Sequence, residues 1–283
     1  MSPEFAPAVR EALAIYQEIC GDTLTAVYVE GSVHRGEAVL GISDLDMSGY
    51  ISAPLPPAAR EHFYLLTDTR LARWPPLPRG VGVPRMPDWL KGAWLERPSA
   101  ERADAVRRWL RAVDTGVRPD PEALERVRYL ALAFLHRYDT TLVYGDDVLA
   151  GYPVPAPAAS LARVLVRGPV RIVRLASQGR DDPESPLPTE PVDRLRRLAR
   201  LTVRIGASVL MAHGGFRSFR GVDVLPALEH HAPRWANFLQ DTGRCYVRVQ
   251  PHAPAGQAYL CTLADFAEWS QQEVEAAWAA AGD

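Results

Sequence analysis

The amino-acid sequence predicts an α+β protein, with a small mixed sheet and helices in its first part and a mainly helical second part. Residues 24–29 are rich in β-branched and aromatic side chains, and residues 44–51 alternate polar with apolar ones, as strands do. Apolar residues recur at three-to-four spacing over 4–19 and 191–212, which is the period of an amphipathic helix. Strand patterns therefore occur early in the chain, and helical patterns dominate later.

A turn-rich segment indicates where one domain ends and the next begins. Residues 115–121 read TGVRPDP, and glycine, proline and aspartate in such a cluster favour turns. The chain has 283 residues, which is long enough for two modest domains. We therefore expect a first domain at 1–117 and a mainly helical domain at 118–283.

The remaining elements follow from the same patterns. A proline-rich stretch at 54–57 ends the second strand and precedes a helical pattern at 58–72. Residues 80–83 (GVGV) have the pattern of a short strand, and helical spacing returns at 100–113. In the second half, helices are expected at 121–138, 158–166, 191–212, 222–230 and 263–280, with short strands at 245–249 and 258–261.

Composition and charge exclude several classes of protein. The net charge of −2 does not suggest a nucleic-acid binder, which usually carries a basic face. No apolar run approaches bilayer length and the N-terminus lacks an apolar signal core, so we expect no membrane partner and a cytoplasmic location. Cys20, Cys245 and Cys261 are widely spaced, which indicates neither a zinc site nor a disulfide framework and fits a reducing compartment.

The most informative segment lies at 28–52 and reads YVEGSVHRGEAVLGISDLDMSGYIS. Gly31 follows a buried strand, where the backbone can turn tightly and admit a ligand closely. Ser32 offers a hydroxyl and suits the start of a helix, whose backbone amides favour an anion such as a nucleotide phosphate. Asp44 and Asp46 share one face of the next strand because side chains alternate, and paired carboxylates suit Mg²⁺ beside substrate phosphates. The segment therefore predicts a site for a metal-bound nucleotide.

This segment resembles the nucleotidyltransferase signature of the DNA polymerase β superfamily, in which Gly-Ser is followed, after a similar spacer, by Asp-apolar-Asp. RGEA at 35–38 and SDLD at 43–46 also match small-molecule and minimal nucleotidyltransferases of that superfamily. LVYGDDVLAGYPVP at 142–155 and the arginine-rich helix followed by Arg220 are similar to aminoglycoside adenylyltransferases of the streptomycin/spectinomycin type. The resemblance implies a polymerase-β-like domain, followed by a helical domain that covers substrate and nucleotide.

The resemblance also implies an activity, a cofactor and partners. A nucleoside monophosphate, AMP from ATP, would move to a hydroxyl of a small molecule such as an aminoglycoside-like compound. Asp44 and Asp46 would be catalytic and would hold one or two Mg²⁺ ions that neutralise charge on the phosphates. The nucleotide-binding residues that it implies are Gly31, Ser32, Ser43 and Arg220.

A third carboxylate belongs to the signature, usually on a neighbouring strand. The strand pattern at 80–83 is the expected place, and it contains no acid. Asp88 is the nearest downstream candidate for a catalytic role, and it equally suits the N-cap of a helix that starts at Trp89. Asp68 and Glu96 are further options.

Two alternatives remain open on the sequence. Without a third acid at the site, the chain would be a catalytically silent nucleotide-binding or regulatory protein of the same fold. RGEA and SDLD also fit an antitoxin-type nucleotidyltransferase that modifies proteins.

We interpret His34 as a surface group. His213, His230 and His231 have a spacing that suits no zinc motif, and we interpret them as structural or exposed.

Overall fold

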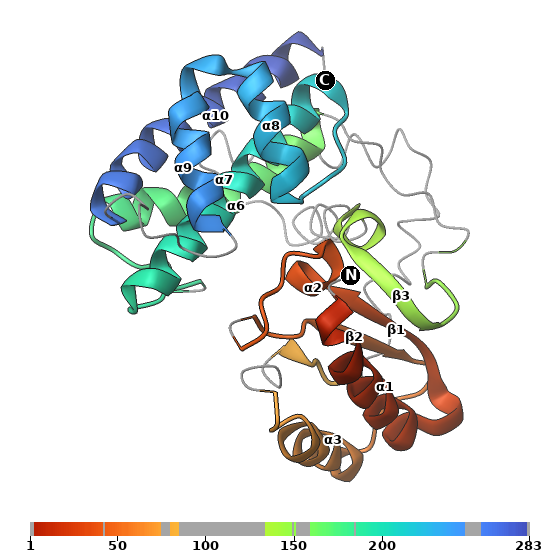
Figure 1. The fold of residues 1–283 in the computed structure, drawn as a ribbon. Coiled ribbons are helices and arrows are strands. Elements are labelled where there is room, and N and C mark those ends of the chain that lie inside the picture. The colour runs from red at the N-terminus through yellow and green to blue at the C-terminus, as the bar shows by residue number, and fades with distance from the viewer. Residues whose placement is uncertain are drawn as a thin grey trace. The chain divides into compact units, whose positions relative to one another are not determined.

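The computed structural model describes residues 3–41, 43–74, 80–84, 134–148, 150, 159–183, 185–246 and 256–281. The chain divides into two compact units (Figure 1). Among the described residues, those up to 150 belong to the first unit and those from 159 onward belong to the second. The expected boundary near residue 117 and the helix expected at 100–113 lie outside the described residues and stay predictions.

The first unit is built around a three-stranded sheet. Its elements in chain order are η1 (Pro3–Phe5), α1 (Ala6–Cys20), η2 (Gly21–Thr23), β1 (Leu24–Glu30), α2 (Gly31–Arg35), β2 (Met47–Ile51), α3 (Pro57–Arg70) and β3 (Thr140–Gly145). The strand order is β2-β1-β3, and both pairings are antiparallel, with Val27 opposite Gly49 on one side and Tyr144 on the other. Val81 adds an isolated parallel bridge to Met47. The helices expected at 4–19 and 58–72 and the strand at 24–29 are thereby confirmed.

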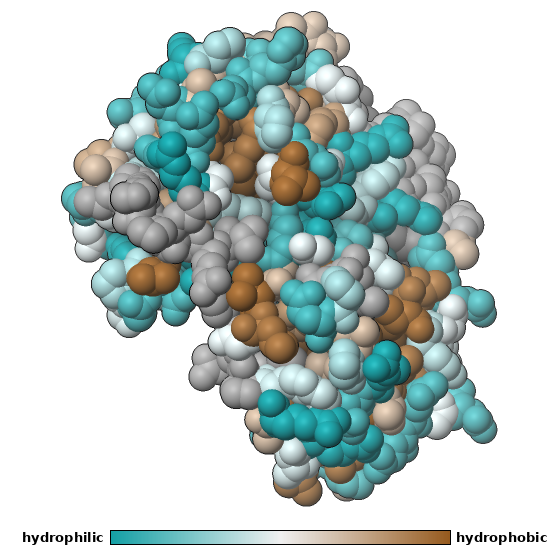
Figure 2. Space-filling view, viewed as in Figure 1, coloured by the Kyte–Doolittle hydropathy of each residue, from teal (hydrophilic) through white to brown (hydrophobic). Residues whose placement is uncertain are grey.

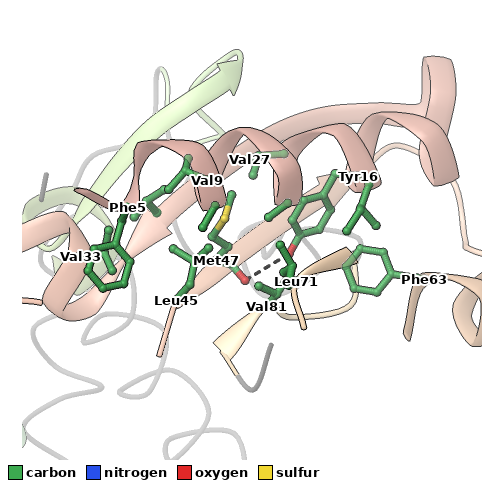
Figure 3. Close-up of a cluster of buried hydrophobic side chains, with 14 of the residues drawn as sticks. Phe5, Val9, Tyr16, Val27, Val33, Leu45, Met47, Phe63, Leu71 and Val81 are labelled. Carbon is green, nitrogen blue, oxygen red and sulfur yellow. Dashed lines mark hydrogen bonds between the residues drawn. The ribbon is translucent and has the colours of Figure 1, made fainter. Parts of the chain in front are cut away.

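One face of the sheet packs against α1 and α3 (Figure 3). Tyr16 of α1 is fully buried, and its ring centroid lies 5.0 Å from that of Phe63 of α3. The Tyr16 hydroxyl donates to the Met47 carbonyl at 3.2 Å, which ties α1 to β2. Gly49 of β2 leaves room for this ring, because a Cβ there would lie 2.4 Å from Tyr16 Cε1. The core therefore holds β2 in place directly after the two aspartates of the motif.

The opposite face of the sheet carries a small aromatic cluster. The His136 ring lies 4.2 Å from the Tyr28 ring and 5.7 Å from the Tyr50 ring, centroid to centroid. The Tyr28 hydroxyl donates to Asp147 Oδ1 at 3.0 Å and accepts from the Val148 N–H at 2.8 Å. Burial raises the pKa of Tyr28. Residues that follow the expected boundary at 117 thus complete the sheet of the first unit.

The second unit is a bundle of helices. They are α6 (Ala159–Ser177), α7 (Pro191–Gly214), α8 (Gly221–His231), the short η4 (Pro233–Trp235), α9 (Ala236–Tyr246) and α10 (Gly256–Ala280). The central helix α7 packs against α6, α8, α9 and α10. The fully buried Tyr259 hydroxyl hydrogen-bonds with the Thr202 and Thr242 hydroxyls, each at 2.8 Å, and so links α10, α7 and α9. The helices expected at 191–212 and 222–230 are confirmed.

The prediction of short strands in the last part of the chain is wrong. Residues 258–261 lie in α10, and Cys245 and Tyr246 end α9, while 247–249 lie outside the described residues. The side chains of Tyr259, Leu263, Phe266 and Ser270 are all buried, which is three-to-four spacing on one face of a helix. That face meets α7, and its burial outweighs the weak strand preference of a few aromatic and β-branched residues.

The surface carries no extended apolar region on the side that Figure 2 shows, where apolar residues occur in separate patches among hydrophilic ones. Large exposed apolar residues of the described ranges are Leu40, Tyr64, Leu65, Leu142, Val192 and Val222. None of the helices in the described ranges is both long enough and apolar enough to cross a membrane.

Candidate functional site

Gly31 occupies a turn that only glycine accommodates without strain. It follows β1 directly and opens the short helix α2 with a φ of 62°, in the left-handed region. A Cβ placed on Gly31 would lie 2.3 Å from Asp46 Oδ2 and 3.2 Å from Asp46 Cγ. The Asp46 carboxylate therefore lies directly against the backbone of the Gly-Ser turn, and the missing side chain makes that position available.

Asp44 and Asp46 lie on an extended segment whose burial alternates. Ser43, Leu45 and Met47 are buried, whereas Asp44 and Asp46 are half-buried. Leu45 and Met47 point into the core of the first unit (Figure 3). In an extended backbone, alternate residues face opposite sides, so the two aspartates share the face away from that core.

The segment is fixed to β1 by a backbone hydrogen bond. The Glu30 N–H donates to the Asp46 carbonyl at 2.8 Å, one residue beyond the pairing of Val29 with Met47. The regular strand β2 begins at Met47, three residues later than the expected start at Asp44. This pairing places Asp46 at the end of β1, beside Gly31.

The two serines of the motif shape its turns. Ser32 is buried, and its carbonyl accepts from the Glu37 N–H at 2.9 Å. The expected capping role of Ser32 is not observed, because the N-cap of α2 is Glu30 and no side chain caps that helix. The Ser43 hydroxyl oxygen accepts from the Val39 N–H at 3.0 Å, which closes the loop before Asp44. Nucleotide contacts by either serine stay a prediction.

Arg35 of the RGEA segment forms a buried ion network. Its Nε lies 3.0 Å from Glu37 Oε2, and its Nη1 donates to both carboxylate oxygens of Asp139, at 2.9 and 2.7 Å. The three side chains expose only 9%, 6% and 14% of their surface, so the charges are compensated in a largely dry setting. Arg35 thereby joins α2 to the residues that precede β3.

His34 of α2 has a hydrogen-bonding partner on β3. Its Nδ1 lies 2.7 Å from the Thr141 hydroxyl, and the side chain is half-buried, so the interpretation of His34 as a plain surface group is wrong. The sequence did not single out Asp139 or Thr141, because each lies more than a hundred residues from its partner.

The third carboxylate expected on the strand pattern at 80–83 is not found among the described residues of that segment. Gly80 and Val81 do lie next to the motif, since a Cβ on Gly80 would meet the Leu45 carbonyl and Val81 bridges to Met47. The described residues 80–84 contain no acid. Asp68 is exposed on α3, whereas Asp88 and Glu96 lie outside the described residues.

The carboxylates of Asp44 and Asp46 fit what Mg²⁺ requires of a protein beside substrate phosphates. Within the described ranges, neither Asp44 nor Asp46 belongs to a group of three or more His, Cys, Asp or Glu residues whose ligand atoms lie close together. Mg²⁺ needs only one or two protein carboxylates when substrate phosphates and water supply the remaining oxygens. The placement of Asp46 over Gly31, with Asp44 on the same face, fits that requirement.

Arg220 belongs to the second unit, where it is the N-cap residue of α8 with an extended backbone. Its side chain is about half exposed, and its Nε lies 3.9 Å from Asp223 Oδ2. Ser218 completes this corner by donating its hydroxyl to Asp223 Oδ2 at 2.6 Å and accepting from the Arg220 N–H at 3.1 Å. A role of Arg220 in closing over a triphosphate stays a prediction.

Replacing Gly31 by alanine tests the Asp46 contact. Gly36 is a matched control, because its φ of 75° carries the same backbone penalty while a Cβ there would meet nothing within 4 Å. Both substitutions are expected to lower the free energy of unfolding by about 1–2 kcal/mol, as measured by urea denaturation. In Gly31→Ala the Asp46 carboxylate can rotate away from the added Cβ, and this rotation moves it from its place beside the turn. Only Gly31→Ala should therefore also weaken Mg²⁺-dependent nucleotide binding. Equal binding by the two variants would contradict the contact's role.

Comparisons with known proteins identify a likeness in structure. No protein-family profile matches the sequence, and no curated protein matches it. The structure is similar to the crystal structure of spectinomycin adenyltransferase AAD(9) from Enterococcus faecialis with ATP and spectinomycin. The TM-score is 0.51 at 11% sequence identity, and the match covers 95% of this chain and 98% of the other. The chain therefore has an α+β fold that is distantly related in structure to that of an adenyltransferase.

Proposed function

We propose that the protein is a Mg²⁺-dependent nucleotidyltransferase, which moves AMP from ATP to a hydroxyl of a small, aminoglycoside-like acceptor. The observation that carries this proposal is the Asp46 carboxylate lying against Gly31, with Asp44 on the same face. The fold likeness to a protein determined with ATP and spectinomycin supports the same class of donor and acceptor.

The residues of the first unit have distinct roles in this proposal. Asp44 and Asp46 would hold the magnesium, which when bound neutralises negative charge on the phosphates. The Gly31 turn lets the Asp46 carboxylate lie against the backbone at the start of α2, because a Cβ on Gly31 would meet its Oδ2. Arg35, Glu37 and Asp139 hold α2 and hence the turn in a fixed orientation. Such transfer relies on positioning and electrostatics more than on covalent catalysis by the protein.

One observation favours a second candidate, a nucleotide-binding protein without transfer activity. The strand segment next to the two aspartates, residues 80–84, carries no acid that would serve as a general base or a third metal ligand. Asp88 would restore the catalytic set if it reaches the acceptor hydroxyl.

The two candidates are separated by measuring nucleotide binding and pyrophosphate release in parallel. Calorimetry with ATP and Mg²⁺ reports binding, and a coupled assay with a panel of aminoglycosides reports pyrophosphate release. We expect pyrophosphate release that requires the presence of one of the acceptors. We also expect Asp88→Asn to abolish this release. Binding without release across the panel would support the silent alternative, and absence of Mg²⁺-dependent binding would overturn both.

A further inference from the structure

Three metal-binding side chains meet in the second unit, far from the motif in sequence. His213 lies in the last turn of α7, His231 is the last residue of α8, and Glu273 lies on α10. One ligand atom from each lies within 4.8 Å of the others. The His213 Nε2 is 3.4 Å from Glu273 Oε2, and the two imidazole rings are 4.8 Å apart between centroids.

These separations suit a tetrahedral metal ion. Zinc binds histidine nitrogen and carboxylate oxygen at about 2.0–2.2 Å, so two ligands of one tetrahedral zinc are separated by roughly 3.3 Å. The His213–Glu273 distance of 3.4 Å already has this value. His231 offers the third ligand atom, which lies within 4.8 Å of the other two. The side chains of His213 and Glu273 expose 33% and 35% of their surface, which leaves a water molecule access to a fourth position on the ion.

The carboxylate is held in one orientation by a residue on its own helix. The Trp269 indole N–H donates to Glu273 Oε1 at 2.9 Å, and the other oxygen, Oε2, is the one that lies near His213. Hydrogen bonds of this kind orient metal ligands and are a regular part of metal sites. A plain surface ion pair has no need of such a support.

The helices that carry the histidines are packed tightly. A Cβ placed on Gly206 of α7 would lie 2.5 Å from Leu228 Cδ2 of α8, so the two helices make a close contact one turn before His231. Leu228 is fully buried. The ligands therefore project from rigid elements, which keeps their mutual positions defined without a metal.

We propose that His213, His231 and Glu273 form a binding site for a zinc-type divalent transition metal, with a fourth position open to water or a small ligand. Two imidazoles and one carboxylate favour zinc, cobalt, nickel or copper over magnesium and calcium, which prefer oxygen ligands alone. None of these three residues belongs to the set proposed for nucleotidyl transfer, and metal binding by them does not depend on that activity.

The test is zinc binding by the full-length protein after treatment with a chelator. Calorimetry with Zn²⁺ is expected to show one ion per chain, and Co²⁺ should produce the visible absorption of a tetrahedral complex. His231→Ala and Glu273→Gln should each weaken Zn²⁺ binding by at least about 100-fold, whereas Trp269→Phe, which removes only the supporting hydrogen bond, should cost about 10-fold.

The chain offers two matched controls. His230 is adjacent to His231 on α8 and is not part of the cluster, so His230→Ala should bind Zn²⁺ like the wild type. Cys261 is an exposed thiol that would itself attract zinc, and Cys261→Ser should also leave binding unchanged. Circular dichroism verifies that each variant is folded. Equal affinity of wild type and His231→Ala, or loss of binding in Cys261→Ser, would overturn the site.

Discussion

Replacing either aspartate of the motif by asparagine is expected to lower nucleotidyl transfer by at least about 100-fold, the loss typical of removing one electrostatic contact to the transition state. Asparagine keeps the shape of Asp46 and its place against Gly31, but it removes the negative charge that would hold the proposed Mg²⁺. The loss should appear in kcat/KM for ATP measured over a range of Mg²⁺ concentrations, and calorimetry should show that Mg²⁺ no longer strengthens ATP binding.

Asp22→Asn is the matched control for this pair. Asp22 is an exposed carboxylate in η2, which precedes β1 and lies at the other end of that strand from Gly31. The same chemical change there should leave kcat/KM and Mg²⁺ dependence at wild-type values. If Asp44→Asn and Asp46→Asn bind ATP and Mg²⁺ as well as Asp22→Asn does, the proposed nucleotide site is wrong.

The second large effect is expected from Arg35→Ala, which should lower the free energy of unfolding. This substitution removes the guanidinium that Glu37 and Asp139 share, and both side chains are mostly buried. Removing one partner of a buried ion pair typically costs about 3–5 kcal/mol, because the charge that remains is uncompensated and poorly solvated. Urea denaturation followed by circular dichroism gives the free energy of unfolding directly.

Arg137 provides the comparison for Arg35. Its Nη1 lies 3.0 Å from Asp147 Oδ2, but its side chain exposes 38% of its surface. Solvent screens such a pair, and Arg137→Ala should cost only about 0–1 kcal/mol. Arg35→Lys should lie between the two alanine variants, since lysine keeps the charge but has one nitrogen in place of the Nε that contacts Glu37 and the Nη1 that contacts Asp139. Equal stability of Arg35→Ala and Arg137→Ala would mean that the network does not support the turn.

The local part of the fold could be predicted from the sequence. The helices α1 and α7 follow from apolar periodicity. The strand β1 follows from its β-branched and aromatic residues, which are buried on both faces of the sheet. The motif is equally local. Gly31 follows a strand, and the alternation at 43–47 is a property of extended backbone that requires no knowledge of distant residues.

The strand patterns at the end of the chain show where local reasoning fails. A few aromatic and β-branched residues around 245–249 and 258–261 suited strands, yet the described ones, 245–246 and 258–261, lie in helices that pack against α7. Tyr259 is the clearest case. Its hydroxyl reaches Thr202 and Thr242, which come from two other helices, and such contacts leave no signal in a short window of sequence.

The sequence alone was sufficient to place a Gly-Ser turn and two aspartates on neighbouring elements, because their relation depends on strand geometry over about fifteen residues. Only the tertiary structure revealed that Asp46 lies against Gly31, that Arg35 pairs with Asp139, and that His213, His231 and Glu273 converge. The histidine spacing suited no zinc motif because the third ligand comes from another helix. Side chains brought together by packing carry no fixed spacing in the chain, so no sequence pattern encodes them.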